Sequence, residues 1–222
     1  LPMDRVEKGI RDAVAALSYN GGEAAMEAIL TTDLVKKNIA VEVKLENGGK
    51  VVIGAMAKGS GMIHPNMATM LGYVTTDAVI KKEALQAALS EVNERTFNMI
   101  SVDRDTSTND SLIVLANGLA GNKEIDSTGS VDYLAFKKGL TVVLEYLAKS
   151  IAKDGEGATK LVEVAVKNAV TFDDAKKVGI SVITSPLVKT AIFGQDANWG
   201  RIIAAVGYSG VDVAENLIDI SV

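Results

Sequence analysis

The spacing of apolar residues predicts a chain that mixes helices with strands. Apolar residues every three or four positions, as in Met3, Val6 and Ile10, predict an amphipathic helix over residues 3–18. Similar patterns and helix-start signals predict further helices over residues 23–30, 82–96, 130–153, from 173 onward, 186–192 and 199–206. Ser130 is suited to cap the long helix over 130–153, and Pro186 is suited to the first turn of the helix over 186–192.

Alternation with a period of two predicts the strands. Apolar residues at 39, 41, 43 and 45 precede Asn47-Gly48-Gly49 and a second apolar run over 51–57, which together predict a β-hairpin. Further strands are expected over 70–75, 99–103, 111–116, 160–169, 180–184 and 218–222, with 99–103 and 111–116 as a second strand pair.

This order of elements predicts an α+β fold of layered helices and mostly antiparallel sheets. Hairpins and helices follow one another without a strict βαβ rhythm. No linker-like or repetitive stretch divides the chain, so residues 1–222 are expected to form one continuous catalytic unit. The last strand pattern stops without a turn, which indicates a fragment of a longer precursor.

Composition narrows the classes of function. Apolar residues make up 48% of the 222 residues and charged residues 23%, as in ordinary globular proteins. A net charge of −5 argues against nucleic acid as a partner. No apolar run reaches the roughly 18 residues of a membrane span and no signal peptide is visible, so we expect a cytoplasmic protein with no membrane partner. The absence of cysteine and the presence of one histidine argue against a metal site or a Ser-His-Asp triad.

The segment from Lys58 to Leu71 has the parts that an intramolecular acyl shift needs. A glycine-rich loop and a Pro-Asn turn precede Ala68 and Thr69, and a strand follows. Attack of the Thr69 hydroxyl on the Ala68 carbonyl would give an ester, which water would hydrolyse to release two chains. The new α-amine of Thr69 would have a pKa of about 7.7–8.0 and could serve as general base for its own hydroxyl. On the residues alone, a structural turn is favoured over catalysis, with His64 as a turn residue rather than a base.

The run Lys58–Leu71 resembles the processing site of the ornithine acetyltransferases, also called bifunctional glutamate N-acetyltransferases, of arginine biosynthesis. Four more stretches resemble the same family and occur in the family's order. They are Thr31-Thr32-Asp33, Asp103–Asp110, Asp154–Lys160 and Gly194–Arg201, and the five motifs span nearly the whole chain.

The resemblance implies a self-processing, N-terminal-nucleophile-like architecture and a transferase that moves acetyl from N-acetylornithine to glutamate. Some members also take acetyl from acetyl-CoA, which is then a substrate, so no cofactor is expected. Cleavage at Ala68-Thr69 would make residues 1–68 the end of an α chain and 69–222 most of a β chain. The two chains are expected to stay associated as a heterotetramer of two α and two β chains.

Site residues also follow from the resemblance. Thr69 would be the catalytic nucleophile that holds the acetyl group, and Thr31, Lys58 and Glu156 would bind the amino-acid substrate together with Thr69. Lys58 suits a carboxylate and Glu156 suits an ammonium group. On the residues alone, Thr31 could instead cap a turn and Glu156 could be an exposed residue after a helix. The loop 104–110 receives no role, and Trp199 is expected in the core.

The resemblance covers part of the family's length. Members have a longer N-terminal region, with a Thr-Gly pair thought to form the oxyanion hole, and a C-terminal segment that contributes substrate contacts. Loss of one oxyanion donor costs on the order of 10²–10³ in rate. Two other functions therefore stay open: a self-processing aminopeptidase or amidase of related architecture, and an inactive truncated domain.

Overall fold

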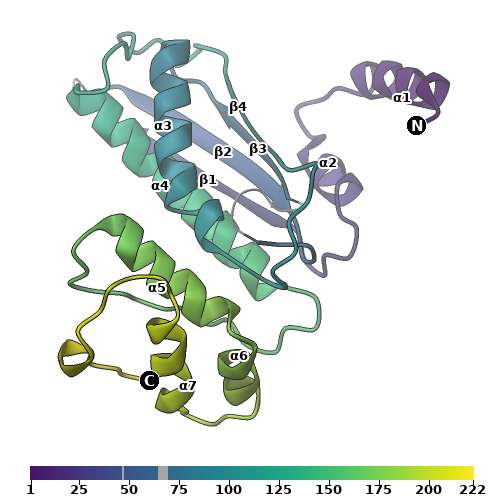
Figure 1. Cartoon of the computed structure of the whole chain (residues 1–222). Coiled ribbons are helices and arrows are strands. Elements are labelled where there is room, and N and C mark those ends of the chain that lie inside the picture. The colour runs from purple at the N-terminus through teal and green to yellow at the C-terminus, as the bar shows by residue number, and fades with distance from the viewer. Residues whose placement is uncertain (47, 65–69) are drawn as a thin grey trace.

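The computed structural model describes residues 1–46, 48–64 and 70–222 (Figure 1). Its α-helices are α1 (Met3–Ala15), α2 (Gly22–Ala28), α3 (Lys82–Glu94), α4 (Val131–Lys153), α5 (Phe172–Thr184), α6 (Pro186–Phe193) and α7 (Trp199–Gly207). Its strands are β1 (Lys37–Lys44), β2 (Lys50–Lys58), β3 (Leu71–Thr76) and β4 (Ser111–Ala116). Two 3₁₀ turns, η1 (Phe97–Met99) and η2 (Glu215–Leu217), complete the described elements.

The four strands form one sheet in the order β1-β2-β3-β4. β1 and β2 pair antiparallel as the predicted hairpin, and Gly48 between them has φ +76°, a conformation that favours glycine. β2 and β3 also pair antiparallel, whereas β3 and β4 run parallel. The predicted α+β class and the mostly antiparallel strand pairing are therefore confirmed.

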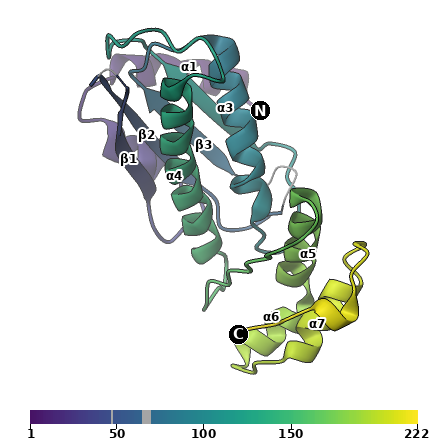
Figure 2. The same ribbon diagram turned by 90° about the vertical axis from the view of Figure 1, so that its left-hand side faces the viewer.

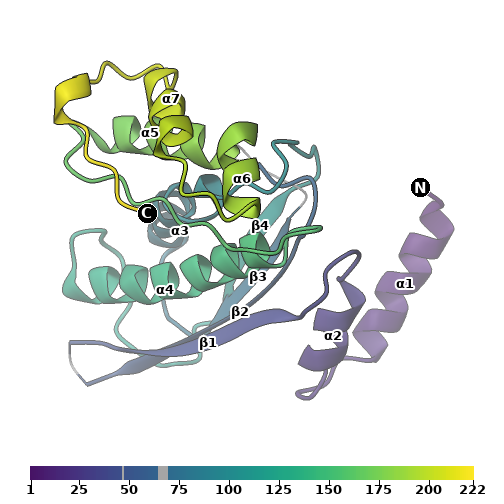
Figure 3. The same cartoon turned by 90° about the horizontal axis from the view of Figure 1, so that it is seen from below.

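One face of the sheet carries most of the hydrophobic core. Figure 1 shows α3 and α4 side by side over this face, and Figure 3 shows α4 running along the sheet. Side chains of α4 at helical spacing, including Phe136, Leu140 and Leu144, are fully buried. Ser130 caps this helix, since its hydroxyl accepts a hydrogen bond from the Tyr133 amide as the sequence predicts.

A second, smaller hydrophobic cluster joins α5, α6 and α7. Its buried members are Val178, Val182, Val188, Ala205 and Val206. Figure 2 shows these three helices gathered beyond one end of α4. That residues 1–222 form one catalytic unit stays a prediction.

Several predicted strands are wrong. Residues 100–110 contain no strand, because backbone groups there bond to neighbouring loops; Val102, for example, donates its amide to the Ile63 carbonyl. β4 consequently pairs with β3. Residues 180–184 belong to α5, since a short apolar run fits a helix as well as a strand. Residues 160–169 and 218–222 join no sheet within the described part of the chain.

Two apolar features are more exposed than expected. The amphipathic helix near the N-terminus exists as α1, but it buries none of its residues and stands away from the sheet (Figures 1 and 3). Trp199, expected in the core, is 66% exposed. Within the described ranges, no helix is long and apolar enough to cross a membrane.

Candidate active site

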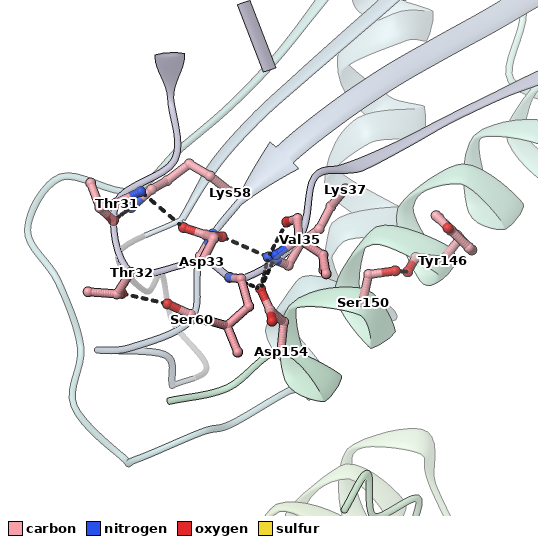
Figure 4. Close-up of polar contacts among 12 residues, drawn as sticks. Thr31, Thr32, Asp33, Val35, Lys37, Lys58, Ser60, Tyr146, Ser150 and Asp154 are labelled. Carbon is pink, nitrogen blue, oxygen red and sulfur yellow. Dashed lines mark hydrogen bonds and ion pairs between the residues drawn. The ribbon is translucent and has the colours of Figure 1, made fainter. Parts of the chain in front are cut away.

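Three segments that are far apart in the sequence meet beside one end of the β1-β2 hairpin (Figure 4). The first is the loop over residues 29–36, which leads into β1. The second is the end of β2 and the glycine loop that follows Lys58. The third follows the last turn of α4 and includes Asp154 and Glu156. Each segment supplies one of the substrate-binding residues predicted among the described residues.

Lys58 and Thr31 are in direct contact. The Lys58 ammonium donates to the Thr31 hydroxyl over 2.9 Å. Lys58 is 7% exposed, whereas Thr31 lies at the surface. A buried ammonium group that reaches an exposed hydroxyl can bind an anionic group of a ligand at that surface.

Glu156 lies against the glycine loop after β2. Its amide donates to the Ser60 carbonyl over 2.8 Å. Its carboxylate lies so close to Gly61 that a Cβ atom on that residue would come within 2.7 Å of Glu156 Oε1. A glycine at position 61 therefore leaves room for the carboxylate to stay beside the loop that begins at Lys58.

A group of buried charges holds these loops together, and we call Asp33, Lys37 and Asp154 the ion cluster. The Lys37 ammonium lies 2.7 Å from Asp33 Oδ1 and 2.6 Å from Asp154 Oδ2. The side chains of Lys37 and Asp33 are fully buried, and that of Asp154 is 6% exposed. The cluster links the first segment, β1 and the end of α4 through one cation.

Backbone amides complete the ion cluster. Gly59 donates its amide to Asp33 Oδ1 over 2.7 Å, and Leu34 donates to Asp154 Oδ2 over 3.0 Å. Burial raises the pKa of Asp33, but the bonds from Lys37, Gly59 and Thr31 outweigh it and hold the pKa below its ordinary value of 3.8. Asp33 therefore stays ionised and fixes Gly59, the residue after Lys58.

A separate set of contacts surrounds the predicted processing segment. Asp103 accepts hydrogen bonds from the amides of Met62, over 2.6 Å, and Ile63, over 3.0 Å. His64 Nδ1 lies 3.1 Å from the Ser101 hydroxyl. Burial, followed by the positive charge of Arg104, lowers the pKa of His64 below 6.5. An imidazole so placed is neutral at pH 7.

Asp110 contacts the other side of the same segment. Its Oδ1 accepts a hydrogen bond from the Met70 amide over 2.7 Å, and the carboxyl group is buried. Burial raises the pKa of Asp110 to about 6, more than the Met70 amide and the charge of Lys58 lower it. A carboxyl group with such a pKa changes its charge near neutral pH.

Ala68 and Thr69, the predicted cleavage site and nucleophile, lie outside the described residues. Thr31, Lys58 and Glu156 come together as described above, and their role in substrate binding stays a prediction. Sequence reasoning missed Lys37, whose spacing of four from Asp33 was the only signal. It also left Asp110 without a role.

A cavity with a volume of about 630 Å³ opens between α4 and the α5–α6 pair. Glu156 lines it together with Lys160 and Lys189, whereas Thr31 and Lys58 do not. A cavity of this size suits a small-molecule ligand. Among the described residues, no group of three histidine or carboxylate side chains could hold a metal ion.

Comparisons with known proteins agree on one family. The model of the ArgJ family matches residues 1–222. Arginine biosynthesis bifunctional protein ArgJ from Symbiobacterium thermophilum is 60% identical over 99% of this chain, and the protein of the same name from Bacillus anthracis is 52% identical over all of it. A crystal structure of arginine biosynthesis bifunctional protein argJ from Bacillus halodurans matches with a TM-score of 0.64 and 53% identity. That match covers 66% of this chain and 68% of the other.

The chain spans 54% of the length of both curated relatives. A region nearly as long as this chain therefore exists in those proteins in addition to the part that matches.

Proposed function

The chain belongs to the ArgJ family, and on this premise we propose that it is part of an acyltransferase that moves acetyl from N-acetylornithine to glutamate. The names of the relatives assign them to arginine biosynthesis and call them bifunctional. We infer that the second function uses acetyl-CoA as an alternative acetyl donor. The proposal needs no cofactor and places the enzyme in the cytoplasm.

One observation carries the substrate side of this proposal: Lys58 contacts Thr31, and Glu156 lies against the glycine loop that follows Lys58. Donor and acceptor are both α-amino acids with a carboxylate. A buried cation suits that carboxylate, and the Glu156 carboxylate suits an ammonium group. Because the ion cluster fixes the loops that carry these residues, their side chains are positioned before a ligand arrives.

Thr69 is proposed to perform two acyl transfers in succession. In the first, its Oγ adds to the Ala68 carbonyl carbon, the bond from that carbon to Thr69 nitrogen breaks, and the nitrogen takes the hydroxyl proton. Water then hydrolyses the ester, leaving a carboxylate on Ala68 and a free amine and hydroxyl on Thr69.

In the second transfer the free amine of Thr69 accepts the proton of its own hydroxyl. Oγ attacks the acetyl carbonyl of N-acetylornithine, and ornithine leaves with the proton on its amine. The amine of glutamate then attacks the acetyl ester and restores the hydroxyl. The α and β chains made by cleavage are proposed to remain together in a heterotetramer of two α and two β chains.

Mass spectrometry of the full-length precursor tests this proposal. Wild-type protein should be cut between Ala68 and Thr69, and Thr69→Ala should stay in one piece. The cut enzyme, given N-acetylornithine without glutamate and then quenched in acid, should carry one acetyl group on the peptide that begins at Thr69. Cleavage at the same bond in Thr69→Ala would contradict the role of Thr69.

The same preparation separates the other two functions. Release of an amine from a peptide amide, without acetyl transfer to glutamate, would favour the self-processing aminopeptidase or amidase. A precursor that stays intact and folded after long incubation would favour an inactive domain.

A further inference from the structure

One loop, residues 101–111, holds the chain on both sides of the predicted processing segment. Near its start, the Val102 amide donates to the Ile63 carbonyl over 2.8 Å. At its end, the Ser111 amide donates to the Met70 carbonyl over 3.0 Å. Asp103 and Asp110 add the side-chain bonds described above to the same two flanks. A single loop therefore contacts the chain on both sides of this segment, in addition to the pairing of β2 with β3.

The two carboxylates differ in burial. Asp103 lies at the surface, whereas Asp110 is only 8% exposed. Since water competes for the hydrogen bonds of an exposed carboxylate, the Asp103 bonds fix the chain less firmly than the bond from Met70 to Asp110.

Burying the Asp110 carboxylate costs more free energy than a bond to one backbone amide requires. Its Oδ2 has no hydrogen-bond partner among the described residues, and neither has Asn93 Oδ1. Both residues line a cavity of about 30 Å³, together with Asn98 of η1. The charged group that acts on Asp110 is Lys58 from β2. A neutral asparagine could accept the same bond from the Met70 amide without the cost of burying a charge.

We propose that Asp110, assisted by Asp103, is a positioning residue for self-cleavage at Ala68-Thr69. The peptide group that donates to Asp110 joins Thr69 to Met70, so this bond fixes the residue that follows the nucleophile. Asp103 fixes the chain five residues before the scissile bond. Restricting both ends raises the fraction of conformations in which a hydroxyl and the neighbouring carbonyl can react. This inference rests on the proposed function, in which Thr69 cuts the chain.

The test follows cleavage in the full-length precursor by intact mass at intervals after cell-free synthesis. Asp110→Ala removes the bond from Met70, and Asp110→Asn keeps an acceptor but removes the charge. Asp77→Ala is the matched control, because Asp77 accepts a bond of 2.7 Å from the Val52 amide elsewhere in the sheet. Thermal melts of each variant record its stability.

Cleavage of Asp110→Ala should be slower by about 100-fold, as expected for a misplaced reacting group. Cleavage of Asp110→Asn should be slower by about tenfold, because a neutral acceptor holds the Met70 amide less strongly than a carboxylate does. Asp103→Asn should slow cleavage less than either. The Asp77→Ala control should cleave at the wild-type rate despite a lower melting temperature. Asp110→Asn should melt above wild type at pH 7 while cleaving more slowly, a combination that a merely structural residue would not give.

The pH profile provides a second measurement. Wild-type cleavage should slow as pH falls through about 6, where Asp110 becomes protonated. This step should be absent in Asp110→Asn and present in His64→Gln, which removes the nearby imidazole. The Asn variant and its profile decide the question if Asp110→Ala does not fold.

Wild-type rates in both Asp110 variants would overturn the inference, as would equal slowing in Asp77→Ala. Cleavage at this bond in Thr69→Ala would instead refute the proposed function. A wild-type precursor that never cleaves would refute both.

Discussion

Asp33 and Asp110 are both buried aspartates that accept hydrogen bonds from backbone amides, yet their pKa values shift in opposite directions. In Asp33, burial raises the pKa, but the bond from Lys37 and those from two amides bring it below 3.8. In Asp110, burial raises the pKa to about 6, and one amide and the more distant charge of Lys58 do not compensate. The difference is a cation in contact with the carboxylate.

This contrast distinguishes the ion cluster, which holds loops in place, from the surroundings of Asp110 beside the predicted processing segment. The ion cluster has its charges paired and bonded, as buried charges in stable structures usually are. Asp110 has a buried carboxyl group next to the predicted processing segment, and its Oδ2 has no hydrogen-bond partner among the described residues. Carboxyl groups with a perturbed pKa of this kind are common at functional sites. Substitutions in the two regions should therefore have opposite effects on stability.

The largest effect is expected from Lys37→Met. The substitution leaves Asp33 and Asp154 buried without their shared cation, and breaking a buried ion pair typically costs 3–5 kcal/mol. Urea denaturation at pH 7 would measure the loss in the free energy of unfolding. Lys36→Met is the matched control, because Lys36 pairs with Glu23 at the surface, where solvent screens the ion pair and leaves it little net effect on stability. Equal effects of the two substitutions would show that the ion cluster stabilises the fold no more than a surface ion pair does.

A smaller effect, of opposite sign, is expected from Asp110→Asn. The folded-state pKa of about 6 lies above the ordinary value of 3.8, so the stability that this group contributes is present below pH 3.8 and lost as pH rises through 6. Asparagine does not ionise, so the variant does not lose this stability as pH rises. The variant should therefore gain on the order of 1–2 kcal/mol over wild type at pH 7.

The advantage of Asp110→Asn should shrink as pH falls from 6 towards 4, as measured by urea denaturation at several pH values. Asp33 has the reverse dependence, since its lowered pKa contributes stability that is present above pH 3.8 and lost as pH falls through the lower folded-state value. Because Asp33 is common to both proteins, its effect cancels in the difference. A variant less stable than wild type at pH 7 would contradict the contrast between the two aspartates.

The smallest effect on stability is expected from Gly61→Ala. The new Cβ atom would meet the Glu156 carboxylate at 2.7 Å, and this exposed side chain can move away at a cost of about 0.5 kcal/mol or less. The displaced carboxylate should nevertheless weaken substrate binding. Steady-state kinetics of the complete enzyme should give a raised KM with kcat little changed, in the same direction as Glu156→Gln. Unchanged kinetics in both variants would remove Glu156 from the substrate site.

Local sequence patterns predicted the elements whose signals lie within one segment. The hairpin around Gly48 and the long helix after Ser130 are examples, because a turn residue and a cap specify their ends directly. The strand expected over 160–169 shows the limit of such reasoning. Its valines at 162, 164 and 166 are each half-buried between exposed neighbours, so the period of two correctly predicts which side chains face the protein. The period does not show whether a partner strand lies beside the segment.

The sequence motifs predict the candidate substrate-binding residues but not the contacts that hold them in place. Thr31, Lys58 and Glu156 were all named from the sequence, and the structure brings their segments together. What holds them could not be read in this way, because the bond between Lys37 and Asp154 joins residues 117 positions apart. Asp110 lies within one of the motifs, but the motif does not reveal its contact with Met70, on which its role depends.

The antiparallel pairing of β2 with β3 has a consequence for assembly. Lys58 at the end of β2 pairs with Leu71 at the start of β3, so a cut at Ala68-Thr69 would fall in the connection between two neighbouring strands of one sheet. The polypeptides on either side of the cut would then share an unbroken hydrogen-bonded ladder and a common core. Refolding would change from a reaction of first order to one of second order, because each polypeptide alone would expose half of a sheet. Cleavage would thus make the native state depend on protein concentration without moving a strand.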